Sequence, residues 1–221
     1  MDLPATLFSE AGQGVLLALA VLGLYLTLRR APWVRLRAPA QLNLLLGFGV
    51  GLMLMWSMRA GVKPGLNLHM LGAMAATLAL GPRFAVLALG IALSGITLNG
   101  AIQWTDWPIN FVLMVLMPVG FANGFQRAVE RWLPAHFFIF VFVTSFAGAA
   151  LTVMAQGLLA SAVMVAAGAY SAGFLFTEYL PFFLLLGFSE AWISGAVITL
   201  LVVYRPDWVA AFDDRRYLLD K

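Results

Sequence analysis

The sequence predicts an all-α integral membrane protein, a bundle of about seven transmembrane helices. Three observations predict this fold class. The chain of 221 residues is 62% hydrophobic and only 10% charged, whereas a soluble domain carries about 25% charged residues. Its apolar residues gather into stretches whose lengths suit a bilayer. Its Lys and Arg residues lie almost entirely in alternate connections between these stretches, as the positive-inside rule requires.

The first two apolar stretches, about 15–28 and 42–58, are read as complete crossings. The first follows a polar segment, residues 1–14, which lacks a basic region and a small-residue cleavage site. A removable signal peptide needs both features, so we expect the first helix and Met1 to be retained in the mature protein.

The third and fourth stretches, about 66–80 and 84–98, are short and are separated by Gly81-Pro82-Arg83. A straight crossing needs about 20 residues. These two helices should therefore continue into polar flanks or line a region that is filled by protein, where short helices are tolerated.

The fifth stretch, about 108–125, contains Pro118, and the seventh covers about 180–204. The sixth, about 134–167, is too long for a straight crossing. It should tilt, protrude or bend near Gln156-Gly157. Residues 205–221 form a polar tail that is expected to be cytoplasmic and amphipathic or frayed.

The basic residues give the orientation. With an outside N-terminus and seven crossings, eleven of the thirteen Lys and Arg residues lie inside, which predicts an N-out, C-in topology. Arg59 and Lys63 are the two outside. We expect one transmembrane domain, 1–221, whose helical bundle covers 15–204. The eleven inside are Arg29, Arg30, Arg35, Arg37, Arg83, Arg127, Arg131, Arg205, Arg215, Arg216 and Lys221.

Several functional classes are excluded by what the sequence lacks. The chain has no cysteine, so thiolate metal sites and disulfides are impossible. The pattern G-x-S-x-G, the pattern H-E-x-x-H and a P-loop are absent, so no enzyme is indicated. No basic patch interleaved with aromatic residues suggests nucleic acid. The lipid bilayer is the one partner that composition requires, and an ATP-driven process would need a separate ATPase chain.

Two histidines are present, and they lie on opposite sides of the predicted membrane. His69 follows Asn67 by two residues at the outer end of the third stretch, and this pair offers N and O ligands that suit divalent transition ions. The alternative is an interfacial histidine bonded to a backbone carbonyl. His136, at the inner interface, is interpreted as a helix-start residue near lipid headgroups.

Few other polar side chains lie in or near the predicted bilayer. Glu190 is deep in the seventh helix and should be neutral, bonded to the hydroxyl of Ser189 or Ser194, or paired with a buried cation. It could serve as a proton or cation relay or as a pin between two helices. Asp106 is interpreted as an N-cap of the fifth helix. Asn110, two residues into that helix, could point either way.

Three segments carry a family resemblance. "GLNLHMLGAMAATLALGPRFAVLALGIAL", "WPINFVLMVLMPVGF" and "GFSEAWISGAVITLLVVYRPDWV" occur in this order. They resemble the histidine-bearing helix with its Gly-Pro turn, the Asn-x-x-x-Met-x-x-Pro segment and the glutamate-bearing final helix of the CbiM/NikM-like permeases. These are the cobalt/nickel capture components of energy-coupling-factor transporters. The resemblance covers roughly residues 40–210 and implies seven helices with the N-terminus outside.

The resemblance also implies a metal site. In that family the N-terminal amine, the backbone nitrogen and histidine side chain of the second residue, and a loop histidine hold the ion in a square plane of nitrogen ligands. His69 matches the loop histidine and Met1 would supply the amine. This chain departs from the family in carrying Asp2 in place of histidine. A carboxylate there should give a harder and weaker site.

Three hypotheses follow. In the first, the protein is a membrane-embedded capture component for a divalent transition metal substrate, Ni or Co, in the bacterial inner membrane. Its site is Met1, Asp2 and His69 with Asn67 or Asn110 in support, and an energy-coupling membrane subunit and ATPase subunits energise it. In the second, the family scaffold holds no metal and binds another small solute or serves a larger complex. In the third, the protein is a proton- or cation-coupled carrier that works through Glu190.

Overall fold

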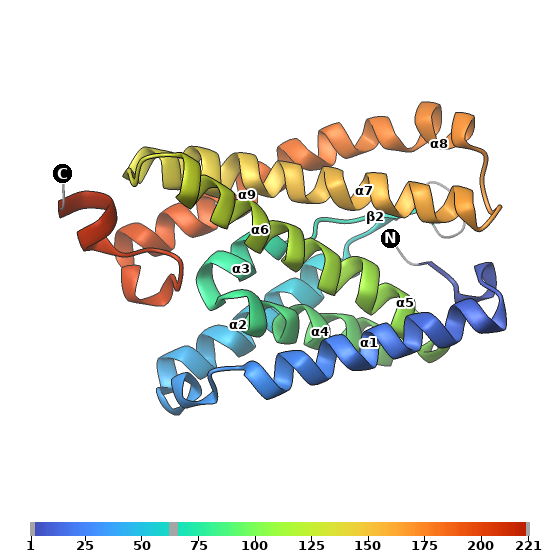
Figure 1. The fold of residues 1–221 in the computed structure, drawn as a ribbon, viewed down its shortest axis with the longest axis horizontal. Coiled ribbons are helices and arrows are strands. Elements are labelled where there is room, and N and C mark those ends of the chain that lie inside the picture. Colours follow the sequence, from blue (N-terminus) through green and yellow to red (C-terminus); the bar gives the residue numbers. More distant parts are fainter. Residues whose placement is uncertain (1–2, 62–65, 220–221) are drawn as a thin grey trace.

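A computed structural model describes residues 3–61 and 66–219. Figure 1 shows an elongated bundle whose long helices follow its long axis. The helices are α1 (Glu10–Arg30), α2 (Pro39–Ser57), α3 (Ala73–Leu80), α4 (Pro82–Leu98), α5 (Trp107–Asn110), α6 (Met117–Trp132), α7 (Gly148–Ala166), α8 (Ala172–Glu178) and α9 (Leu180–Tyr204). The π-helical segment η4 (Phe111–Leu116) joins α5 to α6. A second π-helical segment, η5 (Ile139–Ala147), directly precedes α7 and continues into it.

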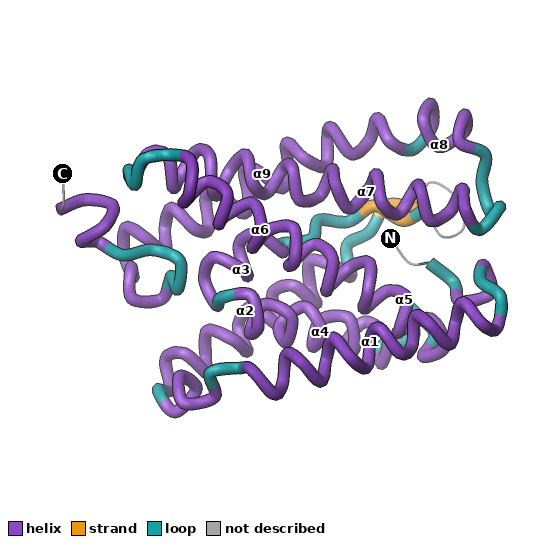
Figure 2. The backbone as a smooth tube through the Cα atoms, viewed as in Figure 1, coloured by secondary structure: helices purple, strands orange, loops and turns teal. Residues whose placement is uncertain are grey.

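Short elements complete the described chain. Four 3-10 turns are η1 (Ala5–Leu7), η2 (Trp33–Arg37), η3 (Trp104–Asp106) and η6 (Pro206–Trp208), and η7 (Arg215–Leu219) is π-helical. The strands β1 (Ala60–Gly61) and β2 (Asn67–Leu68) pair antiparallel, with Ala60 opposite Leu68. Figure 2 shows these strands and their loops running from the α8 end towards the middle of the bundle.

The predicted membrane bundle is confirmed. Among the described residues, five helices are long and apolar enough to cross a membrane, and α4 is a shorter apolar helix. With the short helix α3 they account for the seven predicted stretches. The five long helices are Glu10–Arg30, Pro39–Ser57, Trp104–Trp132, Ile139–Ala166 and Leu180–Tyr204.

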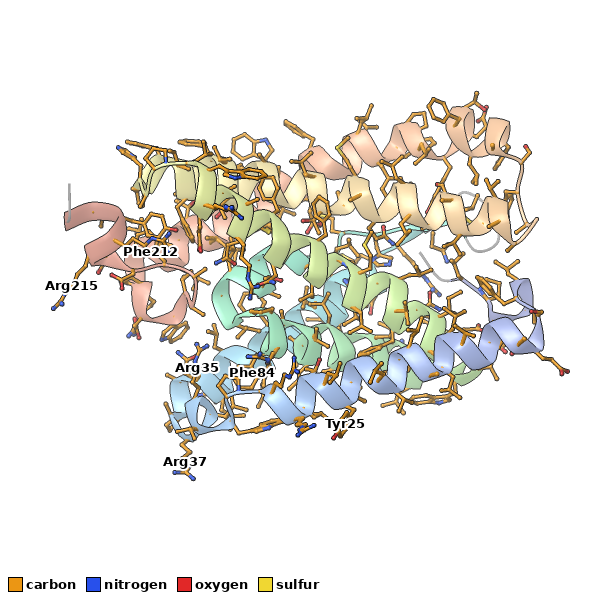
Figure 3. All side chains as sticks on the ribbon, viewed as in Figure 1. Tyr25, Arg35, Arg37, Phe84, Phe212 and Arg215 are labelled. Atoms are coloured by element: carbon orange, nitrogen blue, oxygen red, sulfur yellow. The ribbon has the colours of Figure 1, made fainter. Side chains whose placement is uncertain are left out.

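The labelled arginines gather at one end of the bundle. Arg35, Arg37 and Arg215 lie at the end where the chain terminates (Figure 3). This end is called the inner end below, because the arginine distribution predicts that it faces the cytoplasm. The opposite end, which carries α8, is called the outer end.

The third predicted helix is wrong over its first half. Residues 66–72 are extended or irregular, and α3 begins only at Ala73. Gly72 adopts a left-handed conformation with φ of +66°, which is unfavourable for any residue that carries a Cβ. The backbone N–H groups of Leu71 and Gly72 bond to the carboxylate of Glu190 rather than continuing a helix. A single-sequence pattern cannot show this partner, 119 residues away from Leu71.

Two further boundaries differ from expectation. The sixth stretch was expected to tilt, protrude or bend near Gln156-Gly157, and α7 continues as one α-helix through these residues, from Gly148 to Ala166. Its irregularity lies earlier, in the π-helical η5. Helix α8 was not predicted, and Ser171 starts it by accepting a hydrogen bond at Oγ from the backbone N–H of Phe174.

Helix α3 lies at the centre of the core, and all eight of its residues are buried. Its last carbonyls are paired at the inner end. Leu78 O and Ala79 O accept from the backbone N–H groups of Ala211 and Ala210, at 3.0 and 2.9 Å. The Arg35 Nη1 donates to Leu80 O at 3.3 Å. The last three carbonyls of this short helix therefore have partners that come from other segments, as the end of a helix inside a membrane bundle requires.

A glycine sets how closely α7 and α9 approach. A Cβ placed on Gly157 would lie 2.3 Å from the ring of Phe183, whose side chain is buried. We therefore predict that Gly157→Ala destabilises the protein by about 1–3 kcal/mol, the usual cost of overpacking a well-packed core. Thermal unfolding in detergent would show it as a lower Tm.

Gly47→Ala is the matched control for Gly157→Ala. It also lies within a helix, but no atom lies within 4 Å of its added Cβ. It should leave Tm unchanged or raise it, because alanine has the higher helix propensity. Equal losses of Tm for both variants would show that close packing at Gly157 is unimportant.

Candidate metal centre

The first described residues are held against the bundle by Asn110. Its Oδ1 accepts from the backbone N–H of Leu3 at 3.0 Å, and its Nδ2 donates to Leu3 O at 3.0 Å. The same Nδ2 donates to Asp106 O at 2.9 Å. Asn110 and Leu3 are each only 1% exposed. The side-chain amide therefore pairs with both polar groups of one residue, as a neighbouring β-strand would.

Asp106 adds a second contact to this segment. Its Oδ1 accepts from the backbone N–H of Ala5 at 2.7 Å. The predicted N-cap role is wrong, because Asp106 stands at the N-cap position of α5 but makes no side-chain bond to that helix. The carboxylate of Asp106 bonds to the N-terminal segment instead of capping α5.

These contacts hold the chain against the bundle before α1 begins. In Figure 1 the described segment that precedes α1 lies at the outer end, beside the start of α1. Met1 and Asp2, two of the predicted ligands, lie outside the described residues.

His69 follows β2 in the segment that leads to α3, and it is 6% exposed. Its Nδ1 lies 3.1 Å from Met70 O. A carbonyl oxygen can only accept, so this hydrogen bond assigns the proton of the neutral ring to Nδ1. The lone pair is then carried by Nε2. An imidazole oriented by a backbone carbonyl through one nitrogen is the usual arrangement of a metal-ligating histidine.

Trp56 supports the His69 segment from α2. The rings of Trp56 and His69 lie 5.2 Å apart between centroids, at an interplanar angle of 43°. The indole Nε1 donates to Leu71 O at 3.2 Å, and the side chain is 1% exposed. The ring restricts the movement of the imidazole, and the indole N–H satisfies a carbonyl of the non-helical segment.

Glu190 supports the same segment from α9. Its Oε2 accepts from Leu71 N at 2.9 Å and its Oε1 from Gly72 N at 2.6 Å. Ser194 Oγ also donates to Oε1, at 3.2 Å. Its side chain is therefore surrounded by donors and anchors α9 to the start of α3.

The hydroxyl partner of Glu190 was predicted as Ser189 or Ser194, and the structure selects Ser194. Ser189 Oγ donates instead to Leu185 O at 3.1 Å. The bonds of Glu190 to two backbone N–H groups favour the pin between two elements over the relay. Through these bonds Glu190 holds Leu71 and Gly72, the two residues that follow His69 and Met70 in the chain.

The remaining predicted residues lie elsewhere. Asn67 is in β2, opposite Gly61, rather than on a helix. His136 accepts at Nδ1 from the backbone N–H of Phe138 at 3.1 Å, at the start of the sixth helix. This position agrees with its interpretation as a helix-start residue.

The side chains alone do not form a metal cage. In the ranges 3–61 and 66–219, no group of three His, Cys, Asp or Glu residues could hold an ion. Sequence reasoning missed Trp56 as a support. Its position in the last turn of α2 resembles that of an interfacial anchor, which is how a membrane tryptophan is ordinarily interpreted.

Two solved structures resemble the fold. One, titled "Crystal Structure of an transition metal transporter", is 18% identical with a TM-score of 0.74, and the match covers 91% of this chain and 92% of that one. The other, titled "Crystal Structure of an Truncated Transition metal Transporter", is 17% identical with a TM-score of 0.71, covering 92% and 99%. At these identities the likeness shows the fold.

No curated protein sequence matches the chain. A protein family does match, over residues 2–208, which is most of the chain and includes the His69 segment, Asn110 and Glu190. The chain therefore belongs to the CbiM family, the cobalt uptake substrate-specific transmembrane region, and is a multi-pass membrane protein of metal uptake.

Proposed function

We propose that this protein captures a divalent transition metal ion, Ni(II) or Co(II), at a site in which His69 Nε2 meets the N-terminal residues. The ion is its substrate. Capture occurs from the outer side of a bacterial inner membrane. An energy-coupling membrane subunit and ATPase subunits, which are separate chains, supply the energy for uptake.

The observation that carries this proposal is the pair of hydrogen bonds between Asn110 and Leu3. A free N-terminus ordinarily frays into solvent. Here residue 3 is instead buried and held by two hydrogen bonds. The proposed ligands, the amine and the imidazole of His69, are nitrogen donors of the kind that Ni(II) and Co(II) prefer.

Asp2 decides how the proposed site departs from the family pattern. Its backbone nitrogen can serve as a ligand as any residue's can, while its carboxylate replaces an imidazole. An oxygen donor favours a harder ion and enforces a square plane less strongly. We therefore expect a smaller preference for Ni(II) over Zn(II) than a histidine at position 2 would give.

The basic inner end is proposed as the docking face for the energy-coupling subunits. Arg127 and Arg131 lie in the last turns of α6, and η2 carries Arg35 and Arg37. Topology determination alone also accounts for these arginines. An acidic or amphipathic partner helix would find its complement here.

The first prediction concerns the ligand itself. His69→Ala should weaken Ni(II) or Co(II) binding about 100-fold or more, since even the loss of an outer-shell partner costs about 10–100-fold. Calorimetric titration at neutral pH, on protein with a native N-terminus and a C-terminal tag, measures the change. His136→Ala is the control and should bind as the unmodified protein does. Equal affinities for the two variants would refute capture through His69.

The second prediction tests the position of the N-terminus. Asn110→Leu keeps the side-chain size but removes both bonds to Leu3, so metal affinity should fall about 10–100-fold, as for a lost outer-shell residue. Asn99→Leu, at an exposed helix end, is the control. If Asn110→Leu folds and binds metal normally, the proposed confinement of the amine is wrong.

The third prediction separates capture from the carrier hypothesis. Glu190→Gln replaces one acceptor oxygen by an NH₂ group that faces a backbone N–H, so the segment after His69 loses a partner. Metal affinity should fall about tenfold, in the range for a lost supporting contact. The carrier hypothesis instead expects unchanged affinity and abolished uptake. Glu10→Gln, on an exposed residue, is the control for both measurements.

A further inference from the structure

A groove lies between α2 and α9, with a volume of about 430 Å³. Its floor is formed by Gly72 and Ala75 at the start of α3, which Figure 1 shows between the two helices. Ile193 and Val197 of α9 line the groove and are exposed. Both α2 and α9 are long and apolar enough to cross a membrane. The groove therefore opens towards lipid.

The dimensions of the groove fit one hydrocarbon chain. From Asn43 to Met55, which line it on α2, a helix advances about 18 Å. A volume of about 430 Å³ over this length gives a mean cross-section of about 24 Å². An α-helix with its side chains is about 10–12 Å across, or roughly 80–110 Å² in section, so a whole helix does not fit inside. Carbon atoms in contact lie about 3.5–4.0 Å apart, which gives one extended hydrocarbon chain a section of roughly 15–20 Å².

The groove also matches one half of the bilayer in position and length. Its inner end is lined by Asn43, in the second turn of α2, and by Trp208, which follows α9. Its other end reaches Glu190, near the middle of α9. Half of a hydrocarbon core of about 30 Å is about 15 Å, close to the length of the groove. These limits correspond to the acyl chain of a lipid in the inner leaflet.

The walls of the groove favour hydrocarbon over water. Away from its two ends and Ser194, the groove is lined only by apolar residues and glycines. Glu190 already accepts from the backbone N–H groups of Leu71 and Gly72 and from the hydroxyl of Ser194. A buried water needs two to four polar partners, which apolar walls do not offer.

Positive charge lies where the headgroup of such a lipid would be. Arg205 is exposed, and its guanidinium lies 5.4 Å from the centre of the Trp208 ring at the inner end of the groove. Arg35 donates to Gln41 Oε1, and Gln41 Nε2 donates to Asp207 O in the same turn as Trp208. Asp207 is the one acidic residue of this set, against two guanidinium groups. A basic site between helices on the cytoplasmic side suits an anionic headgroup.

We propose that the groove between α2 and α9 binds one anionic phospholipid of the inner leaflet. Its acyl chain lies against Gly72 and Ala75, and its phosphate lies beside Arg205 and Trp208. The chain covers the bonds between Glu190 and the start of α3 from the membrane side. The lipid binds whether or not the protein captures metal, since His69 lies outside the groove.

Native mass spectrometry of the full-length protein in detergent tests the acyl-chain site, with phosphatidylglycerol as the probe. The unmodified protein should retain one molecule. No atom lies within 4 Å of a Cβ placed on Gly51, which lines the groove, so Gly51→Leu should fill this space. The retained fraction should then fall about tenfold, as overpacking of a filled site predicts.

Gly120→Leu is the matched control for Gly51→Leu. Gly120 is an exposed helix glycine that also has no atom within 4 Å of an added Cβ, but it lies on α6, outside the groove. This variant should retain phosphatidylglycerol as the unmodified protein does. Equal retention by the two variants would overturn the site.

Thermal unfolding measures the headgroup preference and needs no change inside the groove. Phosphatidylglycerol at about 100 times its Kd should raise the Tm of the unmodified protein by about 5–10 °C, and phosphatidylcholine should raise it less. Arg205→Gln should weaken phosphatidylglycerol binding about fivefold, the effect of one cation near an anionic lipid. Arg127→Gln, which removes another exposed arginine, should not. Equal effects of the two lipids, or of the two variants, would refute an anionic lipid.

Other occupants of the groove would give different results. A second copy of the chain would appear as a dimer that Gly51→Leu dissociates and Gly120→Leu does not. A detergent chain alone would leave Tm unchanged by any added phospholipid. Either result overturns the lipid site. Failure of the unmodified protein to bind Ni(II) or Co(II) would instead refute the proposed function and leave the lipid site standing.

Discussion

The structure depends on the pairing of backbone groups at the two ends of α3. A helix of eight residues inside a membrane bundle leaves N–H groups at one end and carbonyls at the other. Lipid cannot satisfy them. The Glu190 side chain accepts from the N–H groups of Leu71 and Gly72, directly before the helix, and the guanidinium of Arg35 donates to the carbonyl of Leu80 at its end.

The deep polar side chains share one kind of task. Asn110 bonds to the backbone of Leu3, Trp56 to that of Leu71, and Glu190 to those of Leu71 and Gly72. Each holds a non-helical segment in place. Non-helical backbone is tolerated at membrane depth only where protein or water satisfies it. In this protein, that requirement and the positioning of the proposed ligands are met by the same residues.

Composition and hydropathy were sufficient to predict the long crossings and the membrane class. Helices α1, α2 and α9 follow from apolar stretches that are long enough on their own. The true start of α3 was not predictable, because Glu190 takes the preceding N–H groups from a distant part of the chain. Asp106 fits the N-cap pattern, but the N-cap prediction is wrong because its carboxylate accepts from the backbone N–H of Ala5. For Asn110 the sequence left both directions open, and tertiary contacts decided between them.

The number of residues in α3 determines how the residues bonded before its start are positioned relative to the carbonyls bonded at its end. Each residue of an α-helix advances the chain by about 1.5 Å and turns it by about 100°. One inserted or deleted alanine would therefore rotate either the loop bearing the imidazole or the carbonyls at the opposite end out of register with their partners. Conservative replacements within this helix should be tolerated if they preserve volume, whereas changes in its residue count should not. The spacing between Gly72 and Gly81, rather than the identity of the residues between them, sets the register of the two ends.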